Sequence, residues 1–219
     1  MPPRRTTVTE ERPLRADAQR NRRRVLEAAE IVFSRAGNGA TIEDVAREAG
    51  LGVGTVCRHF PTKQALLDEV LNEGYRELIV ALDRALEAEE PAAAFEWYVH
   101  QLAAQQAKRR ALAEQMASEL VMTIDEDLKR EVRTKTTQVL ERAQAAGAIR
   151  ADISPADTSM LFAGIAQITA IVGGDQAVRD RYVAVMLDGL RPGAASPLPG
   201  KPLRFGDLDR LKARQARSR

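Results

Sequence analysis

The sequence predicts an all-α protein, in which a small N-terminal domain of three helices precedes a larger helical bundle. Ala, Leu, Arg and Glu are abundant, whereas aromatic residues make up 4% of the 219 residues. No stretch shows the sustained two-residue alternation of Val, Ile and Thr that is typical of strands. Good helix formers and apolar residues at three- and four-residue spacing recur along most of the chain instead.

Charge is unevenly distributed along the chain. Residues 1–63 hold 12 Lys and Arg against 8 Asp and Glu, residues 64–200 hold 14 against 21, and residues 201–219 hold 7 against 2. A basic N-terminal module suits contact with phosphate groups, and an acidic body would confine that contact to one end. We expect residues 1–16, which lack apolar periodicity, to form a flexible basic arm, and residues 192–219 to form a mobile basic tail.

The first helix is expected to begin near Asp17, a suitable N-cap, and to end at the breaker formed by Gly37, Asn38 and Gly39. Four apolar residues at helical spacing form its inner face: Leu26, Ala29, Phe33 and Ala36.

Residues 17–63 are predicted to contain a helix-turn-helix. Thr41, with Asp44 three residues later, resembles a capping box and starts the first helix of the motif. Two crossed helices need a small residue where they touch, a turn residue that tolerates positive φ, and an apolar anchor. Ala46, Gly50 and Val56 fill these roles at offsets of four and six residues, which places the second helix at about residues 53–59.

The second helix of such a motif enters the major groove of DNA, and small residues at its start let the backbone approach the bases. Thr55 is suited to a phosphate or a thymine methyl, Arg58 to a guanine or a phosphate, and Lys63 to a phosphate. His59 either packs at the end of this helix or contacts a phosphate. The full set of candidate DNA-binding residues is Arg23, Thr41, Gly52, Val53, Gly54, Thr55, Arg58, His59 and Lys63.

Residues 64–191 are predicted to form a helical ligand-binding and dimerisation domain. A long amphipathic helix follows Thr62, a further one begins at Pro91, and a charged one runs from about Asp125. Ser154 and Pro155 start a very apolar helix, and a last helix follows after Asp175.

Large, adaptable side chains in this domain are candidates for the wall of a ligand pocket, although each of them also suits a plain core position. They are Trp97, Tyr98, His100, Met116, Met122 and Phe162. The continuous apolar stripe of the last two helices suits a permanent contact between two copies of the chain. Its candidate interface residues are Met160, Ile165, Ile168, Tyr182 and Met186.

Several classes of protein are not supported. The sequence has no apolar run long enough for a membrane span and no secretion signal, so a cytoplasmic location without a membrane partner is expected. Cys57 is the single cysteine and two histidines accompany it, which excludes an internal disulfide and argues against a metal site. No nucleophile with a paired base appears, so we expect neither an enzyme nor a cofactor. A redox-sensing role for Cys57 and a role of the basic tail in DNA attraction stay open.

Residues 22–70 resemble the DNA-binding region of the TetR (tetracycline-repressor-like) family. The matching positions are Ala28, Ala29, Phe33, Gly37, the run from Thr41 to Ala46, Ala49, Gly50, Leu51, Gly54, Thr55, Val56, His59, Phe60, Lys63, Leu66 and Leu67. Two positions differ from the usual pattern: Gly52 replaces a polar residue, and Cys57 replaces an aromatic residue that touches the DNA backbone.

The resemblance implies a homodimer joined by the last two long helices of each chain, and a repressor that binds a palindromic operator in double-stranded DNA. It also implies that an unknown small-molecule effector enters the body, moves the fourth helix and releases the operator. The alternative is a helical ligand-binding or adaptor protein that keeps the fold without regulation by an effector.

Overall fold

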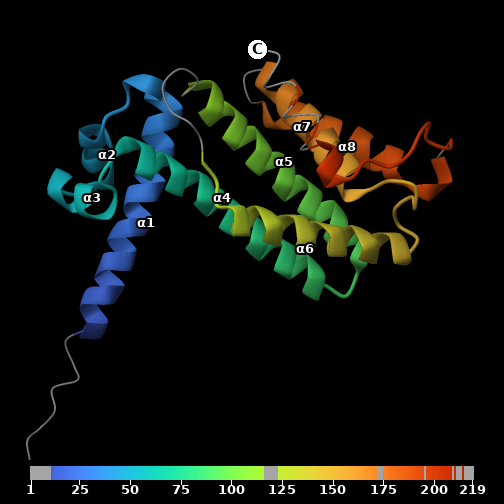
Figure 1. The fold of residues 1–219 in the computed structure, drawn as a ribbon, viewed down its shortest axis with the longest axis horizontal. Coiled ribbons are helices and arrows are strands. Elements are labelled where there is room, and N and C mark those ends of the chain that lie inside the picture. The colour runs from blue at the N-terminus through green and yellow to red at the C-terminus, as the bar shows by residue number, and fades with distance from the viewer. Residues whose placement is uncertain are drawn as a thin grey trace, which may run out of the picture. The chain divides into compact units, whose positions relative to one another are not determined.

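A computed structural model describes residues 11–115, 123–171, 175–194, 196–208, 210 and 214. These residues form helices, and none of them lies in a strand. The chain divides into two compact units. The first contains residues up to Leu71 together with residues 112–123, and the second contains residues 72–111 and those from Ile124 onward (Figure 1).

The first unit is built on a long helix that packs against two short ones. Its elements are α1 (Glu11–Ala36), the 3₁₀ turn η1 (Gly37–Gly39), α2 (Ile42–Ala49), α3 (Val53–His59) and the start of α4 (Lys63–Glu87). All four helices contribute fully buried apolar residues to the interior of this unit. These are Val25, Val32, Phe33, Val45, Val56, Leu66 and Leu67.

The first helix begins earlier than the sequence pattern indicates. Helix α1 starts at Glu11, not near Asp17, so residues 11–16 of the expected flexible arm are helical. The physical reason is that Glu, Arg, Leu and Ala in this stretch favour a helix. Pro13 is tolerated because it lies in the first turn, where the backbone N–H has no partner within the helix.

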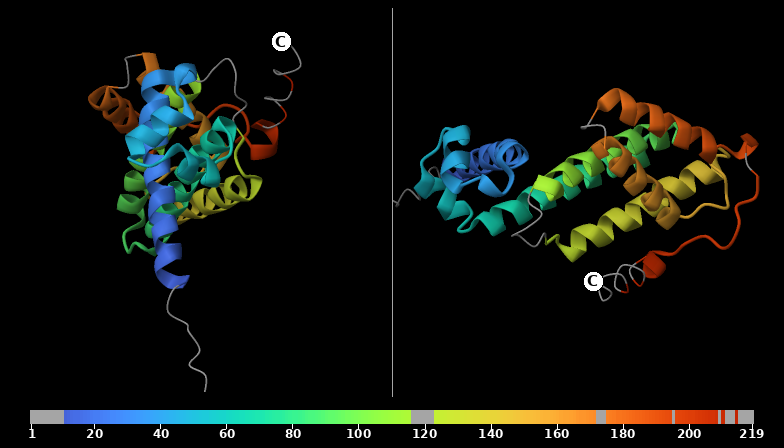
Figure 2. Two further views of the ribbon diagram at one scale, coloured as in Figure 1. Left: turned by 90° about the vertical axis from the view of Figure 1, so that its left-hand side faces the viewer. Right: turned by 90° about the horizontal axis from the view of Figure 1, so that it is seen from above.

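The second unit is a bundle built from the rest of α4 and the later helices. These are α5 (Pro91–Gln115), α6 (Glu126–Ala145), α7 (Pro155–Ile171), α8 (Gln176–Leu190) and the 3₁₀ turn η2 (Pro192–Ala194). Carboxylates and hydroxyls define the helix starts: the Asp125 carboxylate accepts from the Asp127 N–H over 2.7 Å, and that of Asp175 accepts from the Val178 N–H over 3.1 Å. Helices α7 and α8 lie side by side (Figure 2).

Arg142 of α6 closes the end of α4. Its guanidinium donates to the carbonyl oxygens of Ala85, Leu86 and Ala88 over 2.9, 2.5 and 2.8 Å. A helix leaves its last carbonyl groups without partners inside the helix, and a cation there also complements the helix dipole. Arg142 therefore ties α6 to the point where α4 ends.

The C-terminal segment, residues 196–208, differs from the expectation of a mobile tail. Arg150 donates to the Ser196 carbonyl over 2.7 Å, and the Asp157 carboxylate accepts from the Leu203 N–H over 3.2 Å. The segment thus runs back along the second unit (Figure 2) and ends in a helical turn at residues 205–208, where Leu208 is buried. The segment is rich in Pro, Gly and basic residues, and this composition predicts mobility. The expectation differs from the structure because an apolar residue of the segment, Leu208, packs into the second unit.

Candidate nucleic-acid interface and ligand cavity

A complete capping box fixes the start of α2. The Asp44 N–H donates to the Thr41 hydroxyl oxygen over 3.1 Å, and the Thr41 N–H donates back to the Asp44 carboxylate over 3.2 Å. The hydroxyl of Thr41 also donates to that carboxylate over 2.7 Å. These hydrogen bonds from Thr41, followed by the one from Arg47, lower the pKa of Asp44.

Gly50 makes the turn between α2 and α3. It lies in the left-handed region at φ 62° and ψ 39°, where a side chain would be strained. Its N–H donates to the carbonyl groups at the end of α2, and the Leu51 N–H donates to the Ala46 carbonyl over 2.9 Å. The turn therefore aims α3 across α2, as the helix-turn-helix pattern predicts.

One side of α3 packs inward and the other faces out. Val56 is fully buried in the core of the first unit, and Phe60 follows it. The outer side carries Gly52, Val53, Gly54 and Arg58, all of which are exposed, and Val53 is 38% exposed. A Cβ atom built on Gly52 or Gly54 would meet nothing within 4 Å. At the start of α3 the backbone is therefore exposed, with no side chains covering it at Gly52 and Gly54.

The remaining predicted DNA-binding residues differ in how much of their side chain is already engaged. Arg23 is exposed and Thr55 is half-buried. The Thr41 hydroxyl belongs to the capping box, and Lys63 donates to the Asn38 carbonyl over 2.7 Å. His59 is half-buried beside the ring of Phe60, with the ring centroids 6.3 Å apart.

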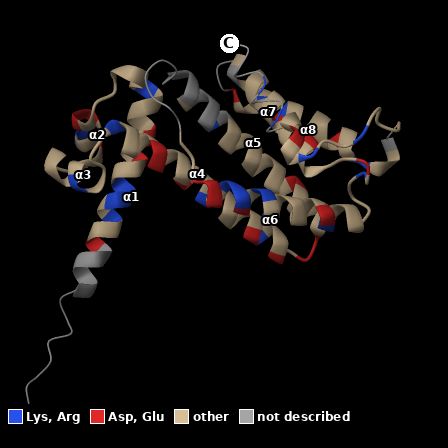
Figure 3. Cartoon of the chain, in the orientation of Figure 1, with Lys and Arg blue, Asp and Glu red and all other residues tan. Residues whose placement is uncertain are grey.

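Two basic residues of α1 make contacts within the first unit, a role that sequence reasoning missed. Figure 3 shows basic positions along this helix. Arg24 donates to the Ala49 carbonyl over 2.6 Å, and Arg22 pairs with Glu69 while lying 5.5 Å from the centre of the Phe60 ring. Part of the positive charge of this unit is therefore bound to groups within the unit itself, namely the Ala49 carbonyl and the Glu69 carboxylate.

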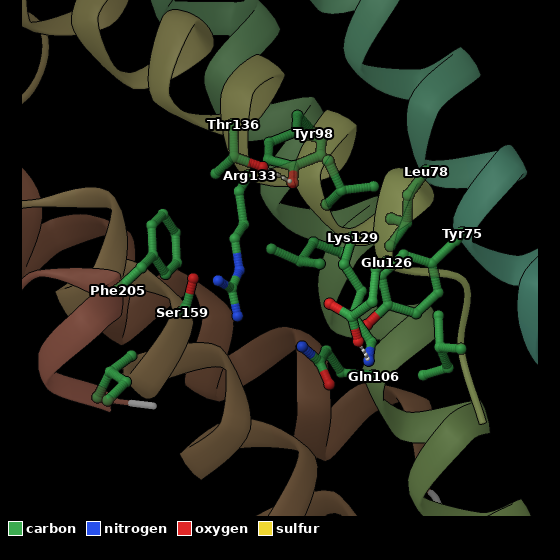
Figure 4. A pocket seen from close by; sticks show the side chains of 14 residues that line it. Tyr75, Leu78, Tyr98, Gln106, Glu126, Lys129, Arg133, Thr136, Ser159 and Phe205 are labelled. Atoms are coloured by element: carbon green, nitrogen blue, oxygen red, sulfur yellow. Dashed lines mark hydrogen bonds and ion pairs between the residues drawn. The ribbon is translucent and has the colours of Figure 1, made fainter. Parts of the chain in front are cut away.

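The second unit contains a cavity of about 490 Å³. Figure 4 shows the side chains around it, which come from α4, α5, the residue Ile124 before α6, α6, α7 and the C-terminal segment. The lining is Tyr75, Leu78, Tyr98, Leu102, Gln106, Ile124, Glu126, Lys129, Val132, Arg133, Thr136, Ser159, Phe205 and Leu208. Such a mixture of apolar walls with a few polar groups is typical of small-molecule sites.

Tyr98 is the predicted pocket residue that lines this cavity. Burial raises its pKa to about 12, and its hydroxyl shares a 2.9 Å hydrogen bond with that of Thr136, so it stays neutral at physiological pH. The useful sequence signal is a stripe on α5, since Tyr98, Leu102 and Gln106 recur at four-residue spacing.

Three other predicted pocket residues lie elsewhere in the second unit and do not line this cavity. The Trp97 ring lies under the Arg84 guanidinium at 4.7 Å, and His100 lies 3.9 Å from the Asp180 carboxylate. Phe162 is buried in the apolar core. Neighbouring positions on a helix face different directions, so Tyr98 can line the cavity while Trp97 does not. Met116 and Met122 lie outside the described residues.

A second hollow of about 670 Å³ lies along the outer face of α7 and α8. All five predicted interface residues line it: Met160, Ile165, Ile168, Tyr182 and Met186. Large apolar side chains on this face are open to solvent in the single chain, including Val185 at 62% and Met160 at 46% exposure. Contiguous exposed apolar surface of this kind marks an interaction face.

A helix-turn-helix with an open second helix, joined to a helical unit that holds a cavity, is the architecture of a DNA-binding transcriptional regulator. Residues 25–70 match the family model described as bacterial regulatory proteins, tetR family, and residues 90–192 match that of the transcriptional regulator SbtR-like C-terminal domain.

Two solved structures agree with these matches. A TetR transcription regulatory protein from Mycobacterium vanbaalenii is 34% identical, with a TM-score of 0.65 over 82% of this chain and 99% of that one. A TetR transcriptional regulator from Streptomyces coelicolor is 30% identical, with a TM-score of 0.65 over 78% of this chain and 98% of that one. The chain belongs to the TetR family of transcriptional regulators.

No curated protein sequence matches the chain. Among the described helices, none combines the length and the apolar character that a membrane crossing requires.

Proposed function

We propose that this regulator is a repressor, which binds a palindromic operator as a homodimer and leaves it when a small-molecule effector occupies the cavity of the second unit. The observation that carries the proposal is the open outer side of α3, where Gly52 and Gly54 leave the backbone uncovered. A backbone without side chains at this point suits close approach to the floor of the major groove.

The proposed DNA contacts divide into two kinds. Thr55 and the backbone at Gly54 are suited to the base edges, and Arg58 to a base or a phosphate. Arg23 and Lys63 are suited to phosphates, where they add affinity without choosing a sequence. Thr41 acts through its capping box, because its hydroxyl is engaged with Asp44. His59 is a candidate phosphate contact from the end of α3.

The apolar face of α7 and α8 supports the homodimer. A free chain would leave Met160 and Val185 in water, and a second copy of the same face would cover them. A dimer presents two copies of α3, and two such helices match two half-sites related by a dyad. This arrangement is the reason to expect a palindrome.

The cavity and the continuity of α4 support control by an effector. Tyr75 and Leu78 of α4 line the cavity, while Lys63 and Leu66 at the start of the same helix belong to the first unit. A ligand that shifts Tyr75 and Leu78 would act on a helix that continues into the DNA-binding unit. A shared rigid element with two arrangements is what coupling between two sites needs.

Selection of purified full-length protein on random duplexes tests the proposal. We expect the recovered sequences to share two inverted half-sites separated by about one helical turn or a small multiple of it. Mapping the recovered site on the genome then shows whether it overlaps a promoter, as a repressor requires. Half-sites that recur singly, or no enrichment at all, would contradict the dimeric repressor.

A further inference from the structure

The C-terminal segment, residues 196–208, forms part of the wall of the cavity in the second unit. Phe205 and Leu208 of this segment line the cavity, together with side chains of α4, α5, α6 and α7. The match to the SbtR-like C-terminal domain ends at residue 192, so this part of the wall lies beyond the matched domain. The cavity therefore has one boundary that the helices of the bundle do not supply.

A short turn holds these two side chains in place. The Arg204 N–H donates to the Asp207 carboxylate over 3.0 Å, and the Leu208 N–H donates to the Arg204 carbonyl over 3.2 Å. Residues that are one helical turn apart face the same way, so Phe205 and Leu208 share one side of this turn. Leu208 is 7% exposed, and the Phe205 ring centre lies 5.0 Å from the guanidinium carbon of Arg133 on α6. The end of the segment is thus a preformed turn with its apolar side toward the cavity.

The rest of the segment is held through its backbone by side chains near the start of α7. The three hydrogen bonds join Arg150 to the Ser196 carbonyl, Asp152 to the Leu198 N–H and Asp157 to the Leu203 N–H. Asp157 divides its carboxylate between two tasks. One oxygen accepts from the N–H and the hydroxyl of Ser154 in the cap of α7, and the other accepts from the Leu203 N–H over 3.2 Å. The last of these anchors lies two residues before Phe205.

The helical part of the wall and the segment differ in how much apolar surface they bury. Leu78, Tyr98 and Leu102, on α4 and α5, belong to the apolar core of the second unit. Phe205 and Leu208 contribute to the cavity wall and not to that core, as the described residues define it, and residues 196–202 are all exposed. Displacing the segment would therefore expose little apolar surface and would break hydrogen bonds that water can replace, whereas displacing a helix would open the core.

We infer that residues 196–208 form a lid on the cavity, which opens to admit a ligand and closes with Phe205 and Leu208 against it. The inference rests on the proposed function, because it names the path by which an effector reaches the same cavity. A lid needs a low cost of opening and a defined closed position. The exposed stretch 196–202 meets the first need, and the preformed turn with its backbone anchors meets the second.

The rate at which a thiol on the cavity wall reacts with N-ethylmaleimide tests the lid. In full-length protein carrying Cys57→Ser, a single cysteine is placed on the wall by Ser159→Cys on α7 or by Gln106→Cys on α5 (Figure 4). Both positions are half-buried. The reference is the natural thiol of Cys57, which is exposed on α3 in the first unit. Mass spectrometry follows the modification, and circular dichroism checks that each variant keeps its helices.

A matched pair of substitutions opens the lid without touching the residues that line the cavity. Leu203→Pro removes the N–H that donates to Asp157, and Leu203→Ala removes the same side chain but keeps that N–H. We expect both cavity thiols to react roughly tenfold faster with Leu203→Pro than with Leu203→Ala, because a hydrogen bond to a charged group is lost. Asp152→Asn, which weakens the anchor at Leu198, should act in the same direction.

The pattern of rates decides the inference. Faster modification of both cavity thiols, at an unchanged rate for Cys57, supports the lid. Equal rates with Leu203→Pro and Leu203→Ala overturn it, and so do cavity thiols that react as fast as Cys57 in the chain with an unaltered segment. An increase at Ser159→Cys alone overturns it as well, since the segment would then shield only part of the wall. A parallel increase at Cys57 would indicate general loosening of the fold and would count against the lid.

Failure of the inference and failure of the proposed function give different results. Binding of the ligand-free wild-type chain to its selected duplex is measured separately and depends on the first unit. A preferred duplex together with unprotected cavity thiols refutes the lid alone. Protected cavity thiols without any preferred duplex refute the repressor and leave the lid standing.

Discussion

Arg24 of α1 donates to the carbonyl oxygen of Ala49, the last residue of α2, over 2.6 Å. A terminal carbonyl of α2 therefore has a cationic partner at the point where the chain turns toward α3. The same guanidinium lies 3.2 Å from the position that a Cβ atom of Gly50 would occupy. The turn and the long helix are thus fitted to each other.

Gly50→Ala should destabilise the protein by roughly 1–2 kcal/mol, because alanine is strained in the left-handed region. The new methyl group would also press on Arg24, whose side chain can shift to relieve the contact. Urea unfolding followed by circular dichroism gives the difference. Stability equal to that of the wild type would contradict the role assigned to this turn.

Gly54→Ala makes a matched comparison inside α3. A methyl group there has open space, and replacing a helical glycine by alanine stabilises a helix by roughly 0.5–1 kcal/mol. We nevertheless expect weaker binding to the selected operator, because the methyl group would stand between backbone and groove. Fluorescence anisotropy measures the affinity. A variant that is more stable and binds the operator with unchanged affinity would contradict the assignment of Gly54 to the DNA interface.

Lys63→Ala should weaken binding to all duplexes and reduce the slope of log affinity against log salt by about one, since one phosphate contact is lost. Thr55→Ala should change affinity in a way that depends on the duplex sequence. Salt titrations with the operator and with a scrambled duplex separate the two effects. Because Lys63 also bonds to the Asn38 carbonyl, the melting temperature of the variant serves as the control for folding. Unchanged DNA affinity in both variants would contradict the assignment of Thr55 and Lys63 to the DNA contact surface.

Val185→Asp should produce a folded monomer. Its side chain is 62% exposed in the single chain, so a charge there costs little in folding, but a carboxylate facing its own copy would oppose the dimer. The control is Val80→Asp on α4, where valine is 68% exposed and the dimer should persist. Sedimentation velocity shows whether each variant is a monomer or a dimer. Loss of the dimer should lower operator affinity by roughly 100-fold, since the two half-sites are then bound separately. A dimeric Val185→Asp variant would rule out this face as the interface.

Acid should loosen the C-terminal segment. The side-chain hydrogen bond from Arg150 is the main cause that lowers the pKa of Asp152 from 3.8 to about 2, and the bond from the Leu198 N–H adds to it. A carboxylate with a lowered pKa stabilises the fold above pH 4, and the contribution is lost as the pH falls toward 2. The amide resonance of Leu198 should therefore shift as the pH falls from about 4 to about 1.5, through the lowered pKa of Asp152.

Asp152→Asn should reproduce that loosening at neutral pH. The amide cannot pair with the charge of Arg150, so trypsin should cut after Arg204 faster than in the wild type. A Leu198 resonance that does not move in acid, together with unchanged cleavage of the variant, would contradict the proposed anchoring of the segment.

The helix-turn-helix could be predicted from local signals because each one is a short-range effect. Thr41 with Asp44, Gly50 and Val56 specify the start, the turn and the anchor within a few residues, and the structure has all three. The start of α1 was misplaced because residues 11–16 form a helix without an apolar face to signal it.

The cavity was harder to predict, because its lining is set by contacts between distant parts of the chain. Tyr98 could be named from its type, but Arg133 and Phe205 come together across some seventy residues of sequence. Phe205 and Leu208 lie one helical turn apart in a basic tail. Two apolar residues are too few to give a periodic pattern that distinguishes a packed helix from a disordered segment.

The most direct test is equilibrium binding of the purified wild-type dimer to its selected operator, against a scrambled duplex of equal length at matched salt. The account predicts a preference of at least roughly 1,000-fold, as specific regulators show. It also predicts that Gly54→Ala lowers the affinity for the operator more than that for the scrambled duplex. Equal affinity for both duplexes, in folded and dimeric protein without effector, would contradict a groove-reading role for α3.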